Sequence, residues 1–103
     1  MKLYTIMDMD AEKCGPIFTA ENEAVCMRLI YSQYKDMPVH ISSRMEVLEL
    51  AELEVSTGYL SGRVCSWTDE AGFEHVKLGA NSLLTIEDIV NSFKKVEDND
   101  SQH

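Results

Sequence analysis

Three acidic residues at alternate positions, Asp8, Asp10 and Glu12, form the densest group of side chains that could share a cation or transfer a proton. They lack the glycine and the closing glutamate of an EF-hand loop. They also lie at the end of an alternating apolar run of the kind that forms strands. We therefore expect a solvated strand end here and no bound metal.

The cysteine and histidine residues also show no pattern that is typical of a catalytic or metal site. Cys14 precedes Gly15-Pro16 and is expected to be exposed, but a cysteine nucleophile needs a lowered thiol pKa and a base within reach. His40 and His75 have no partner at the spacing of zinc ligands. No Walker, Rossmann or nucleophile-elbow pattern is present. The sequence predicts a non-enzyme without metal or cofactor, and a small hydrolase using Cys14 or the acidic residues is a third hypothesis.

The charge of the chain limits its partners. Lys and Arg number 9 against 18 Asp and Glu, which gives a net charge of −9. Such a chain is repelled by phosphate and by anionic membranes, so a cationic protein surface is the easier partner and single-stranded DNA is expected to bind weakly. The alternative is that the charge serves solubility alone. The contact residues that folding could gather are Arg28, Lys35, Arg44, Arg63 and the turn-flanking aromatic residues Tyr59 and Trp67.

The compartment is predicted from two absences. The three cysteines are odd in number and show no CxxC spacing, which favours a reducing compartment. No run approaches the ~18 consecutive apolar residues of a membrane span. The charged Asp8 also interrupts the N-terminal segment before it reaches the length of a signal peptide's apolar region. We expect a cytoplasmic protein, with a small homo-oligomer as one open possibility.

The elements that would position these residues begin with a strand at 3–9 and a helix at 21–35. Thr19 is the expected N-cap of that helix, and Pro38 ends it. Its apolar stripe, expected to face a sheet, consists of Val25, Cys26, Leu29, Ile30 and Tyr34.

The run 45–55 fits two structures. As a strand its apolar residues change face midway, which would indicate a β-bulge, whereas its Ser43 and Glu46 resemble a helix capping box. Residues 59–67 and 73–78 read as a hairpin around Asp69–Gly72. A last helix is expected at 86–96, capped by Thr85, before a disordered polar tail at 98–103.

These elements predict one α+β domain over residues 1–97. A mainly antiparallel sheet of four or five strands packs against the helix at 21–35, and the C-terminal helix is an accessory.

Three segments carry a resemblance: the N-terminal strand with Gly15-Pro16-Ile17-Phe18 and the helix start to Arg28, the run 47–58 ending in Thr57-Gly58, and Leu78 to Leu84. In this order they resemble the small nonstructural protein of the gokushoviruses, single-stranded-DNA bacteriophages of the microvirus family. The resemblance implies that 45–55 is a strand. It also implies a nonstructural phage protein in the cytoplasm of the infected bacterium, where it supports the production of single-stranded genomes.

Two functions are therefore expected. The first is a phage accessory protein for single-stranded-DNA genome production, acting on a phage or host replication protein or through weak DNA contacts. The alternative is an acidic inhibitor that occupies the cationic surface of a host nucleic-acid-binding or defence enzyme, as a DNA mimic does.

Overall fold

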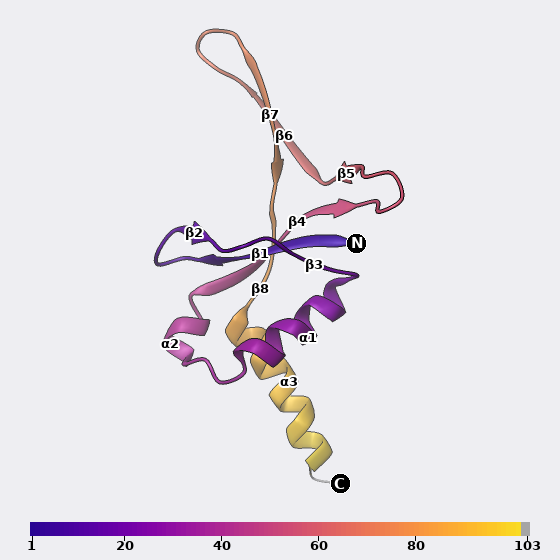
Figure 1. Cartoon of the computed structure of the whole chain (residues 1–103). Helices are drawn as coiled ribbons and strands as arrows, with labels where there is room; N and C mark the ends of the chain where they lie inside the picture. The colour runs from indigo at the N-terminus through magenta and orange to yellow at the C-terminus, as the bar shows by residue number, and fades with distance from the viewer. Residues whose placement is uncertain (102–103) are drawn as a thin grey trace.

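The computed structural model describes the backbone of residues 1–101, and side chains in that range except those of 63–65, 76–78 and 97–101. Strands and helices alternate irregularly along the chain (Figure 1). In order, the elements are β1 (Lys2–Asp8), β2 (Lys13–Cys14), β3 (Phe18–Ala20), α1 (Glu23–Tyr34), α2 (Val39–Ser42), β4 (Met45–Leu53), β5 (Leu60–Ser61), β6 (Arg63–Thr68), β7 (Glu74–Gly79), β8 (Asn81–Thr85) and α3 (Ile86–Ser101).

The antiparallel pair β1 and β4 forms the centre of a six-stranded sheet. Short β2 and β3 pair along the free edge of β1, and β5 and β8 pair along the free edge of β4. Strands β6 and β7 form a separate two-stranded sheet. The predicted α+β class is confirmed, and residues 45–53 of the run 45–55 form a strand. The main sheet has more strands than predicted because two-residue segments join it.

The apolar residues of β4 change face because the strand contains a bulge. Tyr4 is opposite Glu49 and Leu3 is opposite Ala51, so Leu50 is an extra residue with no partner on β1. One additional residue on one strand reverses the alternation beyond it. The predicted bulge is therefore confirmed, and it places Leu48 and Ala51 on the same face of the sheet.

The helix boundaries differ from the predicted ones at three points. The N-cap of α1 is Asn22, whose Oδ1 accepts from the Val25 amide at 3.0 Å, whereas Thr19 is in β3 opposite Leu3. Residues 39–42 form the short helix α2, which was not predicted. Helix α3 continues past Val96 to Ser101. No glycine or proline interrupts residues 97–101, so α3 includes the first residues of the tail predicted at 98–103, and residues 102–103 lie outside the described range.

The hydrophobic core lies between the sheet and the helices, all of which are on one side of β1 in Figure 1. Tyr31 of α1 stacks on Phe93 of α3 with ring centroids 4.9 Å apart, which joins the two helices. Leu29 was predicted to face the sheet but is 40% exposed, because it lies beside the buried positions of its helix. The buried residues of this core are Tyr4, Ala20, Cys26, Ile30, Val47, Ile86, Ile89 and Val90, and Ala51 is buried outside it.

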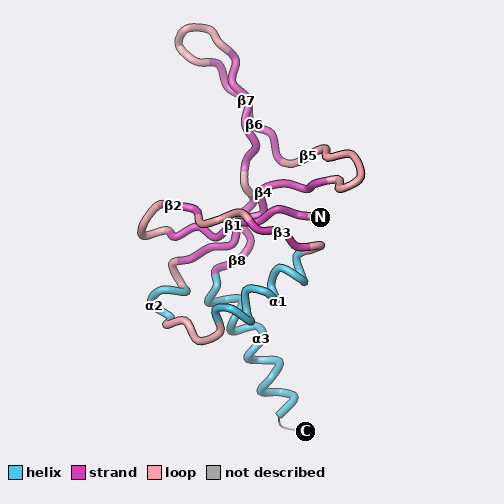
Figure 2. The backbone as a smooth tube through the Cα atoms, in the orientation of Figure 1, coloured by secondary structure: helices cyan, strands magenta, loops and turns pink. Residues whose placement is uncertain are grey.

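Strands β6 and β7 project from this body as an arm (Figure 2). The arm departs from the sheet at the edge of β4, between the places where β5 and β8 pair with that strand. The molecule measures 63 × 36 × 18 Å, and its radius of gyration is 16.8 Å. A compact domain of this length would have a radius of about 13 Å. The arm therefore makes the chain unusually extended. Within the described residues, no helix combines the length and apolar character needed to cross a membrane.

Candidate functional site

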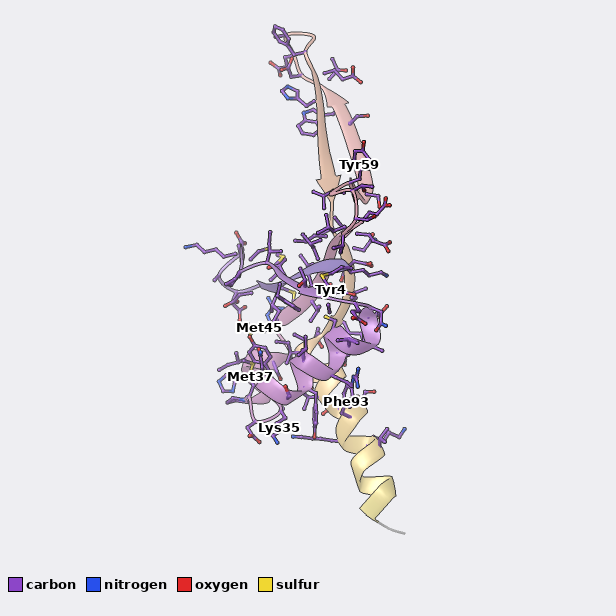
Figure 3. All side chains as sticks on the ribbon, turned by 45° about the vertical axis from the view of Figure 1, so that its right-hand side comes forward. Tyr4, Lys35, Met37, Met45, Tyr59 and Phe93 are labelled. Atoms are coloured by element: carbon purple, nitrogen blue, oxygen red, sulfur yellow. The ribbon has the colours of Figure 1, made fainter. Side chains whose placement is uncertain are left out.

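Three of the four predicted cationic contact residues lie on the body, apart from one another in sequence and structure. Arg28 is exposed on α1, and Lys35 caps the end of that helix. Arg44 precedes β4 and forms an ion pair with Asp10, with Nε and Oδ1 3.0 Å apart. Figure 3 shows Lys35 at the helical end of the molecule and Tyr59 near the base of the arm. The fold therefore does not gather these cations around the exposed aromatic residues.

The predicted aromatic residues occupy different loops and strands. Tyr59 is 75% exposed in the turn between β4 and β5, where its carbonyl oxygen accepts from the Glu54 amide at 2.9 Å. Trp67 is 46% exposed on β6 and stacks on His75 of β7, with ring centroids 5.1 Å apart and an interplanar angle of 15°. The two aromatic residues thus belong to separate surfaces.

The strand register of the arm gathers a set of residues that the linear sequence separates. Trp67 is opposite His75, Cys65 is opposite Lys77, and Arg63 is opposite Gly79. Opposed residues in an antiparallel pair share a face, and alternate residues along each strand share it too. We call this face, with Arg63, Cys65, Trp67, His75 and Lys77, the aromatic face of the arm. The side chains of Arg63, Cys65 and Lys77 lie outside the described ones, so these residues are placed by register.

The aromatic face differs in charge from the chain as a whole. Its strand positions include Arg63, Lys77 and His75 but no carboxylate. The arm's acidic residues are elsewhere: Asp69 and Glu70 are in the turn, and Glu74, opposite Thr68, is on the other face. The strand positions of this face are therefore basic in residue type, and the one carboxylate shown to contact it among the described side chains is Asp69 of the turn, which pairs with His75.

The turn of the arm fixes the Trp67 and His75 rings in place. Asp69 Oδ1 accepts from the amides of Ala71 at 3.0 Å and Phe73 at 2.9 Å, and its Oδ2 is 2.7 Å from His75 Nε2. The hydrogen bond to His75, followed by the backbone bonds, lowers the pKa of the Asp69 carboxyl below its ordinary value. Gly72 adopts φ 88°, the left-handed conformation that a glycine allows without steric cost. The turn thus holds the His75 ring, on which Trp67 stacks.

His75 and Lys77 are the residues that the sequence analysis missed. His75 was considered only as a zinc ligand, and Lys77 was not considered. The signal that could have found them is the hairpin itself. A turn centred on 69–72 sets the pairing of the strands on either side, so it also determines which residues share a face with Trp67.

A second feature is a cavity of about 550 Å³ between α1 and the β1–β2 end of the sheet. Apolar side chains line most of the cavity. Cys14, which is exposed to solvent, is also one of its lining residues. The lining contains no histidine that could act as a base. Its principal apolar residues are Ile6, Phe18, Leu29, Ile30, Tyr34 and Met45.

The acidic residues near this cavity have local structural roles. Asp8 Oδ1 accepts from the amides of Asp10 and Ala11 at 3.0 and 3.1 Å, and Asp10 forms the ion pair with Arg44. Glu12 has a positive φ of 54°. Among the described residues, no group of three or more histidine, cysteine or acidic side chains is placed to hold a metal ion.

The thiol of Cys26 is buried and is a poor nucleophile. It lies against the sheet with no exposed surface, and burial raises its pKa to about 11. At neutral pH it is therefore a thiol rather than a nucleophilic thiolate. Burial likewise raises the pKa of the Tyr4 hydroxyl to about 12.

Comparisons of this chain with protein-family models, with curated proteins and with solved structures give no match.

Proposed function

We propose that this protein supports the production of single-stranded phage genomes and that it contacts single-stranded DNA through the aromatic face of its arm. The observation that carries the proposal is the register of β6 and β7, which assembles Trp67, His75, Arg63 and Lys77 on one face. The resemblance of three sequence segments to a gokushovirus nonstructural protein supplies the biological setting.

The chemistry of the aromatic face suits a single strand. Bases stack on exposed aromatic rings regardless of their identity, and each stacked base contributes about 1–3 kcal/mol. The Trp67–His75 pair offers such a ring surface at 46% exposure of Trp67. Arg63 and Lys77 share the face by register and are of the residue types that bind phosphate.

The same residues predict that binding is weak. Two cations neutralise about two phosphates, which gives a salt slope of about −1.4 for a single strand. The net charge of −9 opposes approach of the strand at low ionic strength. Contact with DNA would therefore be effective when a phage or host replication protein holds the strand nearby, in line with an accessory role.

The test uses the single tryptophan of the chain as its reporter. Titration of the full chain with oligothymidylate should quench the Trp67 fluorescence, because a base that stacks on the indole changes its emission. Substitution Lys77→Gln should lower the affinity and reduce the salt slope by about 0.7. Its matched control Lys35→Gln removes the same charge from the end of α1 and should change neither quantity.

A second arm of the experiment compares aromatic residues. In fluorescence anisotropy with a labelled oligonucleotide, Trp67→Ala should weaken binding by at least fivefold, and Tyr59→Ala should not. Equal losses for Lys35→Gln and Lys77→Gln, or no quenching at millimolar oligonucleotide, would refute the assigned face. Loss of DNA binding together with displacement of DNA from a basic enzyme would favour the acidic-inhibitor alternative instead.

A further inference from the structure

The cavity between α1 and the β1–β2 end of the sheet is large for a chain of this length. Its volume of about 550 Å³ falls within the roughly 300–1,000 Å³ of sites that hold drug-sized ligands. Protein interiors are closely packed, and voids larger than a water molecule are few. The lining residue Leu29 is 40% exposed. Other apolar and aromatic lining residues pack against the core but are only partly buried, namely Ile6, Phe18, Tyr34 and Met45. The cavity therefore leaves apolar surface of both layers incompletely covered.

Backbone hydrogen bonds hold the walls of the cavity in place. The Gly15 amide donates to the Ile6 carbonyl oxygen at 2.9 Å, and the Thr5 hydroxyl donates to the Gly15 carbonyl oxygen at 2.9 Å. These two bonds fasten the β2–β3 loop to β1. The Met9 amide donates to the Arg44 carbonyl oxygen at 2.9 Å, which fastens the β1–β2 turn to the start of β4. The site is therefore formed in advance, and a ligand would lose little affinity to reordering of the chain.

The charges at the cavity balance each other. Among the described residues that line it, the acidic and basic ones are Asp8 and Lys13. They are opposite each other in the β1–β2 pair, where directly opposed side chains have Cβ atoms about 4.5–5.5 Å apart. A charged ligand of either sign would thus meet a like charge beside the opposite one. Because it would leave water without an ionic partner of its own, the charge pattern favours a neutral ligand.

The uncharged polar and aromatic groups of the wall define the ligand further. The Gln33 carboxamide and the Tyr34 hydroxyl, both at the end of α1, can each donate or accept a hydrogen bond. Phe18 of β3 and Tyr34 of α1 contribute aromatic rings from the sheet and from the helix layer. Aromatic rings pair favourably in offset or edge-to-face arrangements. An aromatic ligand with one or two hydrogen-bonding groups therefore suits this wall.

We propose that the cavity binds a neutral, mainly apolar small molecule that contains an aromatic ring. This site goes beyond the proposed function, uses no residue of the arm and does not depend on DNA binding. Affinity for a neutral ligand should not change with salt, whereas the affinity of the arm for DNA should fall. This difference separates failure of the cavity proposal from failure of the DNA-binding one.

The test titrates the full chain with N-phenylnaphthylamine, a neutral aromatic fluorophore whose emission rises in apolar surroundings. A single probe should bind per chain, with an affinity that stays within about twofold between 50 and 500 mM salt. The sulfonated analogue anilinonaphthalene sulfonate has the same rings. It should bind about tenfold more weakly, because its sulfonate loses hydration without gaining a cation that is not already balanced.

Two substitutions locate the bound probe. Leu29→Trp brings an indole ring to the cavity from a half-exposed position, which the fold tolerates, and it should weaken binding about tenfold by filling the site. Its matched control Leu84→Trp makes the same change at a position 39% exposed on β8, outside the cavity lining, and should leave the affinity unchanged. Equal effects of the two variants, or no binding to the unmodified chain at 100 µM probe, would overturn the proposal.

Protection of Cys14 tests the same placement without a substitution. Cys14 is exposed and lines the cavity, so bound probe should slow its alkylation by iodoacetamide. The expected factor is about sixfold at a probe concentration of about five dissociation constants, measured on the Cys14 peptide by mass spectrometry. An unchanged alkylation rate at saturating probe would place the probe elsewhere and overturn the assignment.

Two further outcomes would assign the cavity to a different occupant and overturn the proposed class of ligand. If the sulfonated analogue binds more tightly than the neutral probe and Lys13→Gln abolishes that binding, the occupant is an anionic molecule. If the probe halves the mass of the protein in sedimentation equilibrium, the occupant is a second copy of this chain. The proposal expects the same mass with and without the probe.

Discussion

The helix-covered body and the projecting arm are built from similar residues but held together in different ways. In the body, Ile30, Val47 and Ile89 are at most 2% exposed and pack between two layers. In the arm, two strands pair only with each other, and turn hydrogen bonds to Asp69 fix their register. The difference indicates that tertiary burial sets the stability of the body, whereas local backbone chemistry sets that of the arm.

This contrast has a functional consequence. A surface held by a turn can present rings and charges without disturbing the core. The body, in contrast, offers a 550 Å³ cavity with a mainly apolar lining that contains no histidine. The proposed function puts DNA binding on the arm and leaves stability to the body, and each of the following predictions tests that division.

The largest effect is expected for Ile30→Ala in α1. Ile30 is 2% exposed, and removing its side chain leaves a cavity, so the free energy of unfolding should fall by about 2–5 kcal/mol. The neighbouring Leu29→Ala, at 40% exposure, should cost less than about 1 kcal/mol. Urea unfolding followed by circular dichroism measures both. Equal costs would mean that α1 is rotated from its observed orientation.

A smaller effect, of opposite sign, is expected for Tyr4→Phe. The Tyr4 hydroxyl is buried and has no hydrogen-bond partner among the described residues. An unsatisfied buried hydroxyl costs about 1–3 kcal/mol, so its removal should raise the free energy of unfolding by up to that amount. The ring should keep its stack on Phe18, with centroids 5.8 Å apart. Destabilisation by more than about 1 kcal/mol would show that the hydroxyl has a partner, such as a buried water.

Much of the body could be predicted from the sequence because its elements have periodic apolar patterns. The α1 stripe indicated a helix with one buried face, although Leu29 of that stripe is exposed. The phase change in 45–55 left strand and helix open, and on the strand interpretation it correctly indicated the bulge at Leu50. The N-cap was misplaced because Thr19 and Asn22 are both good caps, and only the pairing of Thr19 with Leu3 excludes it.

The candidate site was harder to predict because it depends on pairing rather than on pattern. Arg63 and Trp67 were predicted as contact residues, but they were grouped with Arg28, Lys35 and Arg44, which lie on the body. Linear charge counting cannot tell which strand positions face the same way. The register of the arm supplies that information and adds His75 and Lys77.

The third prediction concerns the arm alone. Gly72 has φ 88°, and an added Cβ would meet no atom within 4 Å, so Gly72→Ala should cost only the backbone strain of about 1 kcal/mol. Amide exchange in β6 and β7 should accelerate about fivefold, while the core amides of β1 and β4 are unchanged. Gly58→Ala is the control, since Gly58 has φ 77° and open space but is in the β4–β5 turn. Faster exchange throughout the sheet would show that the arm and body unfold as one unit.

The smallest effect is the response of the arm to acid through Asp69. Its carboxyl pKa is lowered in the folded state, first by the hydrogen bond to His75. The stability that the ionised carboxylate contributes is therefore fully present above its ordinary pKa of 3.8 and is lost as pH falls through the lower folded value. Because Asp69 is half-buried in the turn of the arm and its hydrogen bonds are all local, the change should be confined to the arm. In Asp69→Asn the side-chain oxygen can still accept from the Ala71 and Phe73 amides, but the group no longer titrates. Acidification from pH 5 to pH 2.5 should thus shift the Phe73 amide resonance and loosen the arm in the unmodified chain and much less in this variant. The same acid response in both proteins would assign it to carboxylates outside the turn.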